Sequence, residues 1–258
     1  MDKNTGMLEY SLLKSYKNIF AFTTTKQTFD DPAPRFTGDK EEEYIHNRSI
    51  LSNVLKIPTV RLIFPRQTHS NRTVEISEIP SNELQATDAL ITNKKGFCIC
   101  VQTADCVPIL LYDPKNVVVA VVHAGWRGTV RKIVDVTVKK MIQKYHSIPT
   151  ELRAIIGPSI GPEVYEVGTE VVVEVKKNIP NADITLHKNR LNKYHLNLWE
   201  ANRQLLLKIG LNFNHIQISS ECSFTNSDNY FSARREGIHT GRMVTGIMLL
   251  ENDHGSPV

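Results

Sequence analysis

The chain has 258 residues, of which 41% are hydrophobic and 22% are charged, a composition typical of a folded globular protein rather than a fibre or a disordered chain. Its 31 basic and 27 acidic residues give a net charge of +4 without a long run of lysine or arginine, so we expect no nucleic acid among its partners. No segment is apolar enough to cross a bilayer and the N-terminus lacks the pattern of a signal peptide, so we expect no membrane association and a cytoplasmic location.

No internal repeat or flexible linker interrupts the chain, so we expect residues 1–258 to form a single domain. The first predicted helix begins after Asp39, which stands in the N-cap position before a run of glutamates, and it extends to about Leu55. Its apolar stripe includes Tyr44, and Arg48 lies on the same side, toward the expected core. A charge in that position needs a partner. The partner is either a group of the protein, as in a structural ion pair, or a bound anion.

Several short runs are β-branched or aromatic and end at turn residues, which is typical of strands. They are residues 60–64, 89–92, 97–101, 109–112 and 117–122, followed later by 152–156, 216–219 and 243–250. Amphipathic patterns predict helices that begin at Thr129 and cover 169–178 and 198–209. The alternation predicts a mixed α/β fold, and since most strands are apolar on both faces, we expect the sheet to be covered on both sides.

Polar side chains follow three of the predicted strands. The segment VVAVVHAGWRGT at 118–129 is a buried strand that ends at His123 and passes through two glycines into a helix. Ligands of α/β proteins bind where a strand end faces a helix N-terminus, because free backbone N–H groups meet there. Cys106 in TADCVP and His69 after Pro65 also follow apolar strands. These three side chains are the candidate functional residues, although a lone histidine more often belongs to a core.

The four cysteines differ in their settings and are too few for a secreted disulfide scaffold, which favours a reducing compartment. Cys98 and Cys100 alternate within one strand and are expected to be buried core residues. Cys106 is the candidate reactive thiolate. With His69 and His123 it forms either a Cys/His nucleophile pair or the three protein ligands of a zinc ion with an open fourth position, and no short metal motif decides between the two.

Six motifs distributed over the chain carry a family resemblance. They are QTH at 67–69, DALIT at 88–92, TADCVPILLYD at 103–113, HAGWRGT at 123–129, IGPSIGPEVYEVG at 156–168 and FSARREGIHTGRM at 231–243. Together they resemble the laccase-domain family, whose members are regarded as multifunctional purine nucleoside phosphorylases and were earlier described as polyphenol oxidases. The chain departs from the usual family pattern at Ala233, where an aromatic residue is common, and at Ser223, where threonine follows the cysteine in most members.

The resemblance implies a site and a fold. It implies a zinc site made by His69, Cys106 and His123, which are then also the catalytic residues, with copper as the alternative metal. It implies phosphorolysis of adenosine, inosine and methylthioadenosine to the free base and the sugar 1-phosphate, with an added adenosine deaminase activity. Purine nucleosides and phosphate are therefore the implied partners of a monomer or homodimer. The implied fold is a mixed α+β layered sandwich, with mixed sheets covered by helices, related to the folds of cysteine–histidine hydrolases.

Phosphorolysis needs cations to hold the phosphate dianion, and Arg48 and Arg127 are the residues predicted to do so. The predicted function is thus a zinc-dependent purine nucleoside phosphorylase with adenosine deaminase activity. Three alternatives remain, namely a copper-dependent polyphenol oxidase, a metal-independent hydrolase based on Cys106 and His123, and a non-catalytic module that binds purines or metal. The nine histidines include no H-x-H pair, which disfavours a multicopper cluster.

Overall fold

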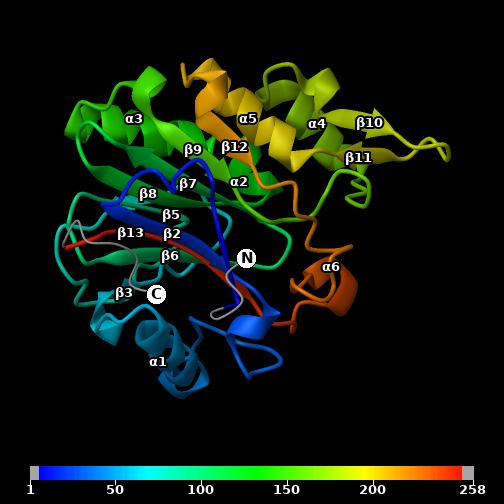
Figure 1. The fold of residues 1–258 in the computed structure, drawn as a ribbon. Helices are drawn as coiled ribbons and strands as arrows, with labels where there is room; N and C mark the ends of the chain where they lie inside the picture. Colours follow the sequence, from blue (N-terminus) through cyan, green and yellow to red (C-terminus); the bar gives the residue numbers. More distant parts are fainter. Residues whose placement is uncertain (1–5, 252–258) are drawn as a thin grey trace.

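The protein's structure, a computed structural model, describes residues 6–251, in which two β-sheets pack face to face between layers of helices (Figure 1). The five-stranded sheet has the order β1-β2-β13-β6-β3 and the six-stranded sheet the order β12-β9-β7-β8-β5-β4. Parallel and antiparallel neighbours occur in both, so both sheets are mixed. The strands of the first are β1 (Met7–Glu9), β2 (Ile19–Thr24), β3 (Leu62–Ile63), β6 (Cys98–Thr103) and β13 (Met243–Leu249). Those of the second are β4 (Thr73–Glu75), β5 (Ala89–Thr92), β7 (Val107–Asp113), β8 (Val118–Ala124), β9 (Arg153–Ile156) and β12 (Ile216–Ile218).

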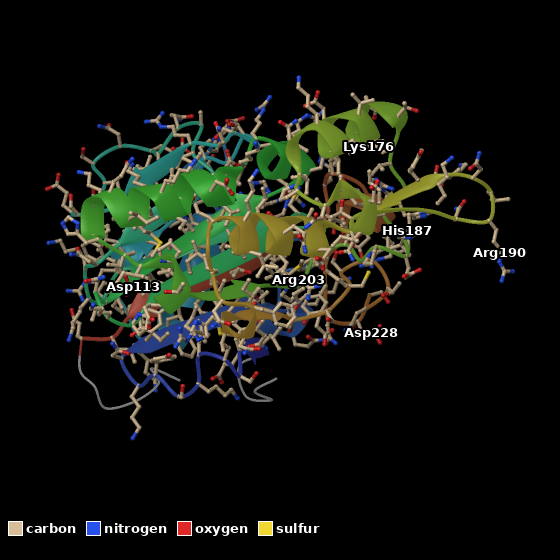
Figure 2. The ribbon with its side chains drawn as sticks, turned by 90° about the horizontal axis from the view of Figure 1, so that it is seen from above. Asp113, Lys176, His187, Arg190, Arg203 and Asp228 are labelled. Atoms are coloured by element: carbon tan, nitrogen blue, oxygen red, sulfur yellow. The ribbon has the colours of Figure 1, made fainter. Side chains whose placement is uncertain are left out.

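Helices cover the outer face of each sheet (Figure 1). Their bounds are α1 (Ile45–Val54), α2 (Trp126–Val130), α3 (Ile133–Tyr145), α4 (Thr169–Asn178), α5 (Leu198–Lys208) and α6 (Ala233–Glu236). Helix α1 packs on the five-stranded sheet, whereas α3, α4 and α5 pack on the six-stranded sheet. A hairpin of β10 (Leu186–Lys188) and β11 (Tyr194–Leu196) extends beyond these layers, with Arg190 at its tip pointing away from the body (Figure 2). None of the helices within residues 6–251 is long and apolar enough to span a bilayer.

The alternation of side chains along the strands explains the layers. In β8, Val118, Ala120 and Val122 contact the helices, while Val119 and Val121 contact the five-stranded sheet. Cys98 and Cys100 of β6 are fully buried in the cluster that includes α1, as predicted. Each central strand therefore has apolar neighbours on both faces. The predicted two-sided burial and the mixed α+β layered sandwich are both confirmed.

The first predicted helix is wrong at its N-terminus. Glu41–Glu43 form a 3-10 turn with Lys40 at the N-cap position and no side-chain cap, and α1 begins only at Ile45. The predicted capping role of Asp39 fails because this carboxylate forms an ion pair with Arg66. The strand predicted at 60–64 is also too long, since a 3-10 turn occupies its first part and leaves only β3.

The helix predicted to begin at Thr129 is in fact two helices. Helix α2 begins at Trp126 and ends at Val130, and Lys132 then takes a left-handed conformation with φ 59° before α3 begins. Thr129 lies inside α2, where its hydroxyl accepts a hydrogen bond from the Asn202 side chain of α5 at 3.1 Å. Sequence patterns also missed β1 and β2, which pair with each other and, through β2, with the C-terminal strand β13.

Candidate metal centre and active site

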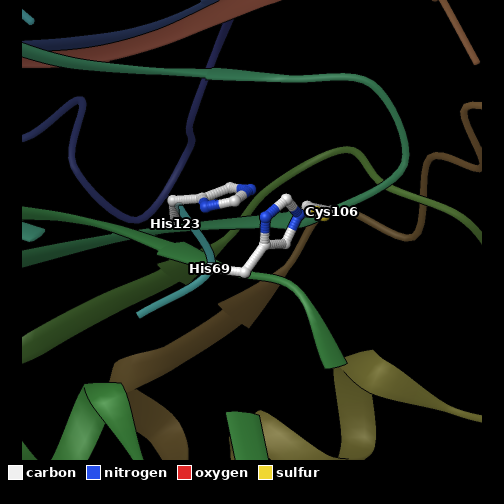
Figure 3. Close-up of side chains that lie close together, drawn as sticks. All are labelled: His69, Cys106 and His123. Carbon is white, nitrogen blue, oxygen red and sulfur yellow. Dashed lines mark hydrogen bonds between the residues drawn. The ribbon is translucent and has the colours of Figure 1, made fainter. Parts of the chain in front are cut away.

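Three side chains from distant parts of the sequence come together, and they are the three that the sequence analysis selected. His69 follows β3, Cys106 directly precedes β7, and His123 is the penultimate residue of β8. One potential ligand atom of each lies within 4.8 Å of the others, and the two imidazole rings are 4.9 Å apart (Figure 3). Among residues 6–251 this is the one group of histidine, cysteine or carboxylate side chains with metal-binding spacing.

Strand pairing produces this arrangement. Strands β7 and β8 pair antiparallel up to their ends, so Cys106, one residue before β7, comes opposite Gly125, one residue after β8. Strand β5 pairs with the other edge of β8, which places Asp88 beside His123. The backbone amide of His123 donates a hydrogen bond to the carbonyl oxygen of Asp88 at 2.7 Å. The ends of three neighbouring strands therefore form one side of the site.

The Asp88 carboxylate holds both histidines, although sequence reasoning did not select it. It is fully buried and accepts a 2.8 Å hydrogen bond from Nδ1 of His123. It also accepts hydrogen bonds from the backbone amides of Thr68, His69 and Ser70 and from the Ser70 hydroxyl. Burial would raise the pKa of Asp88, but the hydrogen bonds from His123 and Ser70 outweigh it and lower the pKa to about 2. The bond to Nδ1 leaves Nε2 of His123 free to face a ligand.

Glycine is required at position 125. A Cβ atom there would lie 2.8 Å from Sγ of Cys106 and 2.9 Å from Cδ2 of His69. Both distances are well below van der Waals contact, so any larger residue would push two of the three side chains apart. The second glycine of the HAGWRGT segment is less constrained, because the nearest atoms to a Cβ at Gly128 are 3.4 Å away.

The charges of the cluster are strongly coupled. Burial would raise the pKa of the Cys106 thiol, but the charges of His123 and His69 lower it to about 6. Burial would lower the pKa of His123, but the Cys106 thiolate and the Asp88 carboxylate raise it to about 9. The metal-free site at neutral pH therefore holds a thiolate beside an imidazolium. Sγ of Cys106 is 3.7 Å from Nε2 of His69.

The donor set fits a transition metal. Two imidazoles and one thiolate are ligands that catalytic zinc sites use with an open fourth position, and the same set occurs in copper sites. The pairing of a histidine ligand with a buried carboxylate is also characteristic of metal sites. Asp88 orients His123, and Gly125 leaves room for Cys106 and His69, so the surroundings of the cluster suit a metal ion held by its three side chains. The other three cysteines lie outside the cluster, and Cys222 accepts a hydrogen bond from the Gly161 amide.

The cluster opens into a cavity of about 520 Å³ that carries three arginines. The cavity is lined by Arg35, Gln67, His69, Gln102, Thr103, Ala104, Asp105, Cys106, His123, Ile160, Tyr165, Ala233, Arg234, Ile238 and Arg242. Arg35 and Arg242 both donate hydrogen bonds to the carbonyl oxygen of Ile238, at 3.0 and 2.9 Å. The guanidinium of Arg234 lies over the Tyr165 ring, 5.2 Å from its centroid. Within residues 6–251, none of the three arginines pairs with a carboxylate.

These unpaired arginines give the cavity an excess of positive charge. Burial and the neighbouring charge of Arg35 lower the pKa of Arg242 to about 10, and burial lowers the pKa of Arg35 as well. Two guanidinium groups that share one carbonyl acceptor repel each other, and a bound anion would relieve this repulsion. The cavity therefore has the electrostatics of an anion-binding site beside a metal centre.

The structure does not bring the two predicted phosphate-binding arginines into this cavity. Nε of Arg48 donates to the carbonyl oxygen of Phe36 at 2.7 Å, and its guanidinium lies over the Tyr44 ring in a separate cavity. Arg48 therefore has structural partners, namely a backbone carbonyl group and an aromatic ring, on the face of the five-stranded sheet that α1 covers. Arg127 is exposed and stacks on Trp126 at 4.4 Å, beside another separate cavity. The arginines that line the cavity are instead Arg35, Arg234 and Arg242.

A family model described as "Multi-copper polyphenol oxidoreductase laccase" matches residues 33–250, and the chain belongs to this family. The resemblance drawn from the six motifs is thereby confirmed.

Curated relatives and solved structures cover nearly the whole chain. "Purine nucleoside phosphorylase" of Bacteroides thetaiotaomicron is 37% identical over 96% of this chain and 97% of its own length. "Adenosine deaminase RL5" of an unknown prokaryotic organism is 38% identical over 91% of this chain and 95% of its own length. The crystal structure of YlmD from Geobacillus stearothermophilus superposes with a TM-score of 0.89 at 28% identity, covering 97% of this chain and 98% of that one.

Proposed function

We propose that the protein is a zinc-dependent purine nucleoside phosphorylase that also deaminates adenosine. The observation that carries the proposal is the junction of the His69, Cys106 and His123 cluster with a cavity whose arginines lack carboxylate partners. The cavity volume of about 520 Å³ falls within the range of small-molecule sites. Relatives named for both activities support the proposal, and adenosine, inosine and methylthioadenosine are the substrates to test.

The proposed zinc ligands are His69, Cys106 and His123. A bound zinc ion supplies Lewis acidity at its open coordination position. Asp88 keeps the proton of His123 on Nδ1 and thereby keeps Nε2 available, while Gly125 leaves space for the Cys106 thiolate beside His69. The chain thus contributes a metal-binding geometry that is arranged before any substrate arrives.

Phosphate is assigned to Arg35 and Arg242. Phosphorolysis requires that a phosphate dianion be held beside the anomeric carbon while the glycosidic bond breaks, and the pair of guanidinium groups supplies matching charge and N–H donors. The nucleoside is assigned to the part of the cavity lined by Tyr165 and Arg234, which we call the nucleoside wall, where the Tyr165 ring and the Arg234 guanidinium offer flat surfaces for a purine. Holding both reactants in one cavity, in the right orientation, makes a bimolecular step effectively unimolecular.

The test is an assay of inosine with and without added phosphate, with the products identified by chromatography and mass spectrometry. We expect ribose 1-phosphate and hypoxanthine only when phosphate is present, and loss of both with Cys106→Ala. Release of the base at the same rate without phosphate would contradict the phosphorylase assignment. Adenosine in the same assay should also yield inosine, the product of deamination.

The phosphate assignment has its own test. Arg242→Gln should raise KM for phosphate by at least about tenfold, which corresponds to about 1.4 kcal/mol of lost binding, while KM for inosine changes little. Arg48→Gln is the comparison, because the sequence analysis assigned phosphate to Arg48 and the structure has it outside the cavity. A larger effect on phosphate KM from Arg48→Gln than from Arg242→Gln would return the assignment to Arg48.

Metal analysis separates this proposal from its alternatives. Protein purified without added metal should contain close to one zinc per chain, and removal of the zinc should abolish phosphorolysis. A thiolate-to-copper absorption band with oxygen uptake on a phenol would favour the polyphenol oxidase. Full activity of metal-free protein would favour the hydrolase based on Cys106 and His123, and nucleoside binding without turnover would favour the binding module. The same preparations would give the oligomeric state, for which we propose a monomer or homodimer.

A further inference from the structure

Asp105, the residue before Cys106, has a backbone conformation unlike that of any other non-glycine residue in the described chain. Its φ is 87°, whereas the nine other non-glycine residues with positive φ lie between 47° and 62°. Those nine fall in or near the left-handed region that L-residues tolerate, and Asp105 falls outside it. Such a conformation persists only where the surrounding structure holds it in place.

Both ends of Asp105 are held by segments that are far away in the sequence. Its carboxylate accepts a 2.7 Å hydrogen bond from the Ser223 hydroxyl and a second, also 2.7 Å, from the backbone amide of Arg234. Its carbonyl oxygen accepts a 3.0 Å hydrogen bond from the amide of Ile160. The residue is buried, so these bonds are protected from water. Asp105 therefore joins the loop of Cys106 to three other segments, and two of them, at Ile160 and Arg234, line the cavity.

The two ends of the residue act on different parts of the site. Its backbone conformation sets the direction in which the chain enters Cys106, and so the place of Sγ among His69 and His123. Its carboxylate binds the free amide at the first turn of α6, and so sets the place of Arg234 over the Tyr165 ring. The family departure at position 223 keeps this contact, because serine retains the hydroxyl that donates to Asp105.

We propose that Asp105 is a positioning residue that couples the metal centre to the nucleoside wall: its backbone orients Cys106, and its carboxylate orients Arg234. The inference rests on the proposed function, because it takes Cys106 as a metal ligand and Arg234 as part of the nucleoside wall. It assigns a separate task to each half of one residue. The two tasks can be separated by substitution, since glycine adopts this φ without strain and alanine does not.

The experiment compares Asp105→Gly with Asp105→Ala. Both remove the carboxylate, but only alanine also loses the backbone conformation. We expect the glycine variant to keep zinc affinity near the wild-type value and the alanine variant to lose at least about tenfold, as is usual when the groups that orient a metal ligand are removed. Both variants should raise KM for inosine by about tenfold and leave KM for phosphate nearly unchanged, since Arg35 and Arg242 are not held by Asp105.

A matched control lies in the β10–β11 hairpin. Asn192 has φ 62° and is remote from the metal centre, so Asn192→Ala and Asn192→Gly repeat the comparison of alanine with glycine at another residue with positive φ. Zinc affinity and both KM values should be equal in these two variants, even where their thermal stabilities differ. A difference in zinc affinity between them would show that general destabilisation produces the effect at Asp105, and would overturn the inference.

Two results at Asp105 itself would also overturn it, namely equal zinc affinity in the alanine and glycine variants, or an unchanged KM for inosine in both. If the alanine variant does not fold, the glycine variant decides, because the inference requires it to retain zinc while KM for inosine rises. If the wild type neither binds zinc nor cleaves inosine, the proposed function fails. In that case, crystal structures of the wild type and the glycine variant test the positioning role separately. The role requires that Sγ of Cys106 stays in place in the glycine variant and that Arg234 moves.

Discussion

The Asp88 carboxylate offers a quantitative test of how the site is built. Its pKa of about 2, against an ordinary value of 3.8, corresponds to about 2.5 kcal/mol of folding free energy at neutral pH. Because the pKa is lower in the folded protein, this contribution is present above about pH 3.8 and is lost as the pH falls through about 2. Asp88→Asn removes the charge but keeps the shape. We therefore expect metal-free Asp88→Asn protein to lose about 2 to 3 kcal/mol in urea unfolding at pH 7.

The same substitution should weaken the metal centre. An amide cannot accept all the hydrogen bonds that Asp88 receives, so Nδ1 of His123 is no longer fixed as the donor and zinc affinity should fall by about 10 to 100-fold. Asp113→Asn is the matched control, because Asp113 is equally buried and accepts backbone hydrogen bonds from Lys115 and Asn116 in a turn away from the cluster. It should lose stability without losing zinc affinity. A loss below about 0.5 kcal/mol with unchanged zinc affinity in Asp88→Asn would show that the Asp88 carboxylate neither stabilises the fold nor orients His123.

Two further predictions concern the packing and the charges of the cluster. Gly125→Ala should lower zinc affinity by at least about tenfold, since its Cβ would displace Cys106 and His69, whereas Gly128→Ala should change it by less than about threefold; equal effects would contradict the packing argument. In metal-free protein the raised pKa of His123, about 9, means that zinc must displace a proton at neutral pH. Zinc affinity measured by competition titration should therefore rise by about tenfold per pH unit between pH 7 and 8.5 and level off above about 9. A flat profile over that range would show that His123 is already neutral.

Short β-branched or aromatic runs that end at turn residues were sufficient to predict most of the central strands. The side chains on both faces of β8 are apolar, because helices cover one face and the five-stranded sheet covers the other. The errors occur where a long-range contact overrides a local pattern. Asp39 resembles an N-cap, but its ion pair with Arg66 occupies the carboxylate. The edge strand β1 pairs with β2, and β2 pairs with β13, more than 200 residues later, and no local pattern encodes such a partner.

Motif residues and apolar periodicity are local properties of the chain, so they were enough to predict the family, the mixed α+β class and the three side chains of the candidate metal centre. The other groups around those three are brought there by contacts between distant segments. Asp88 was visible in the DALIT motif, but its role depends on the pairing of β5 with β8, and Asp105 depends on contacts with Ser223 and α6. The same holds for Arg48, which lines a separate cavity, and for Arg242, which lines the cavity beside the cluster. Arginines look alike in a sequence, and which cavity each one lines is set by sheet packing.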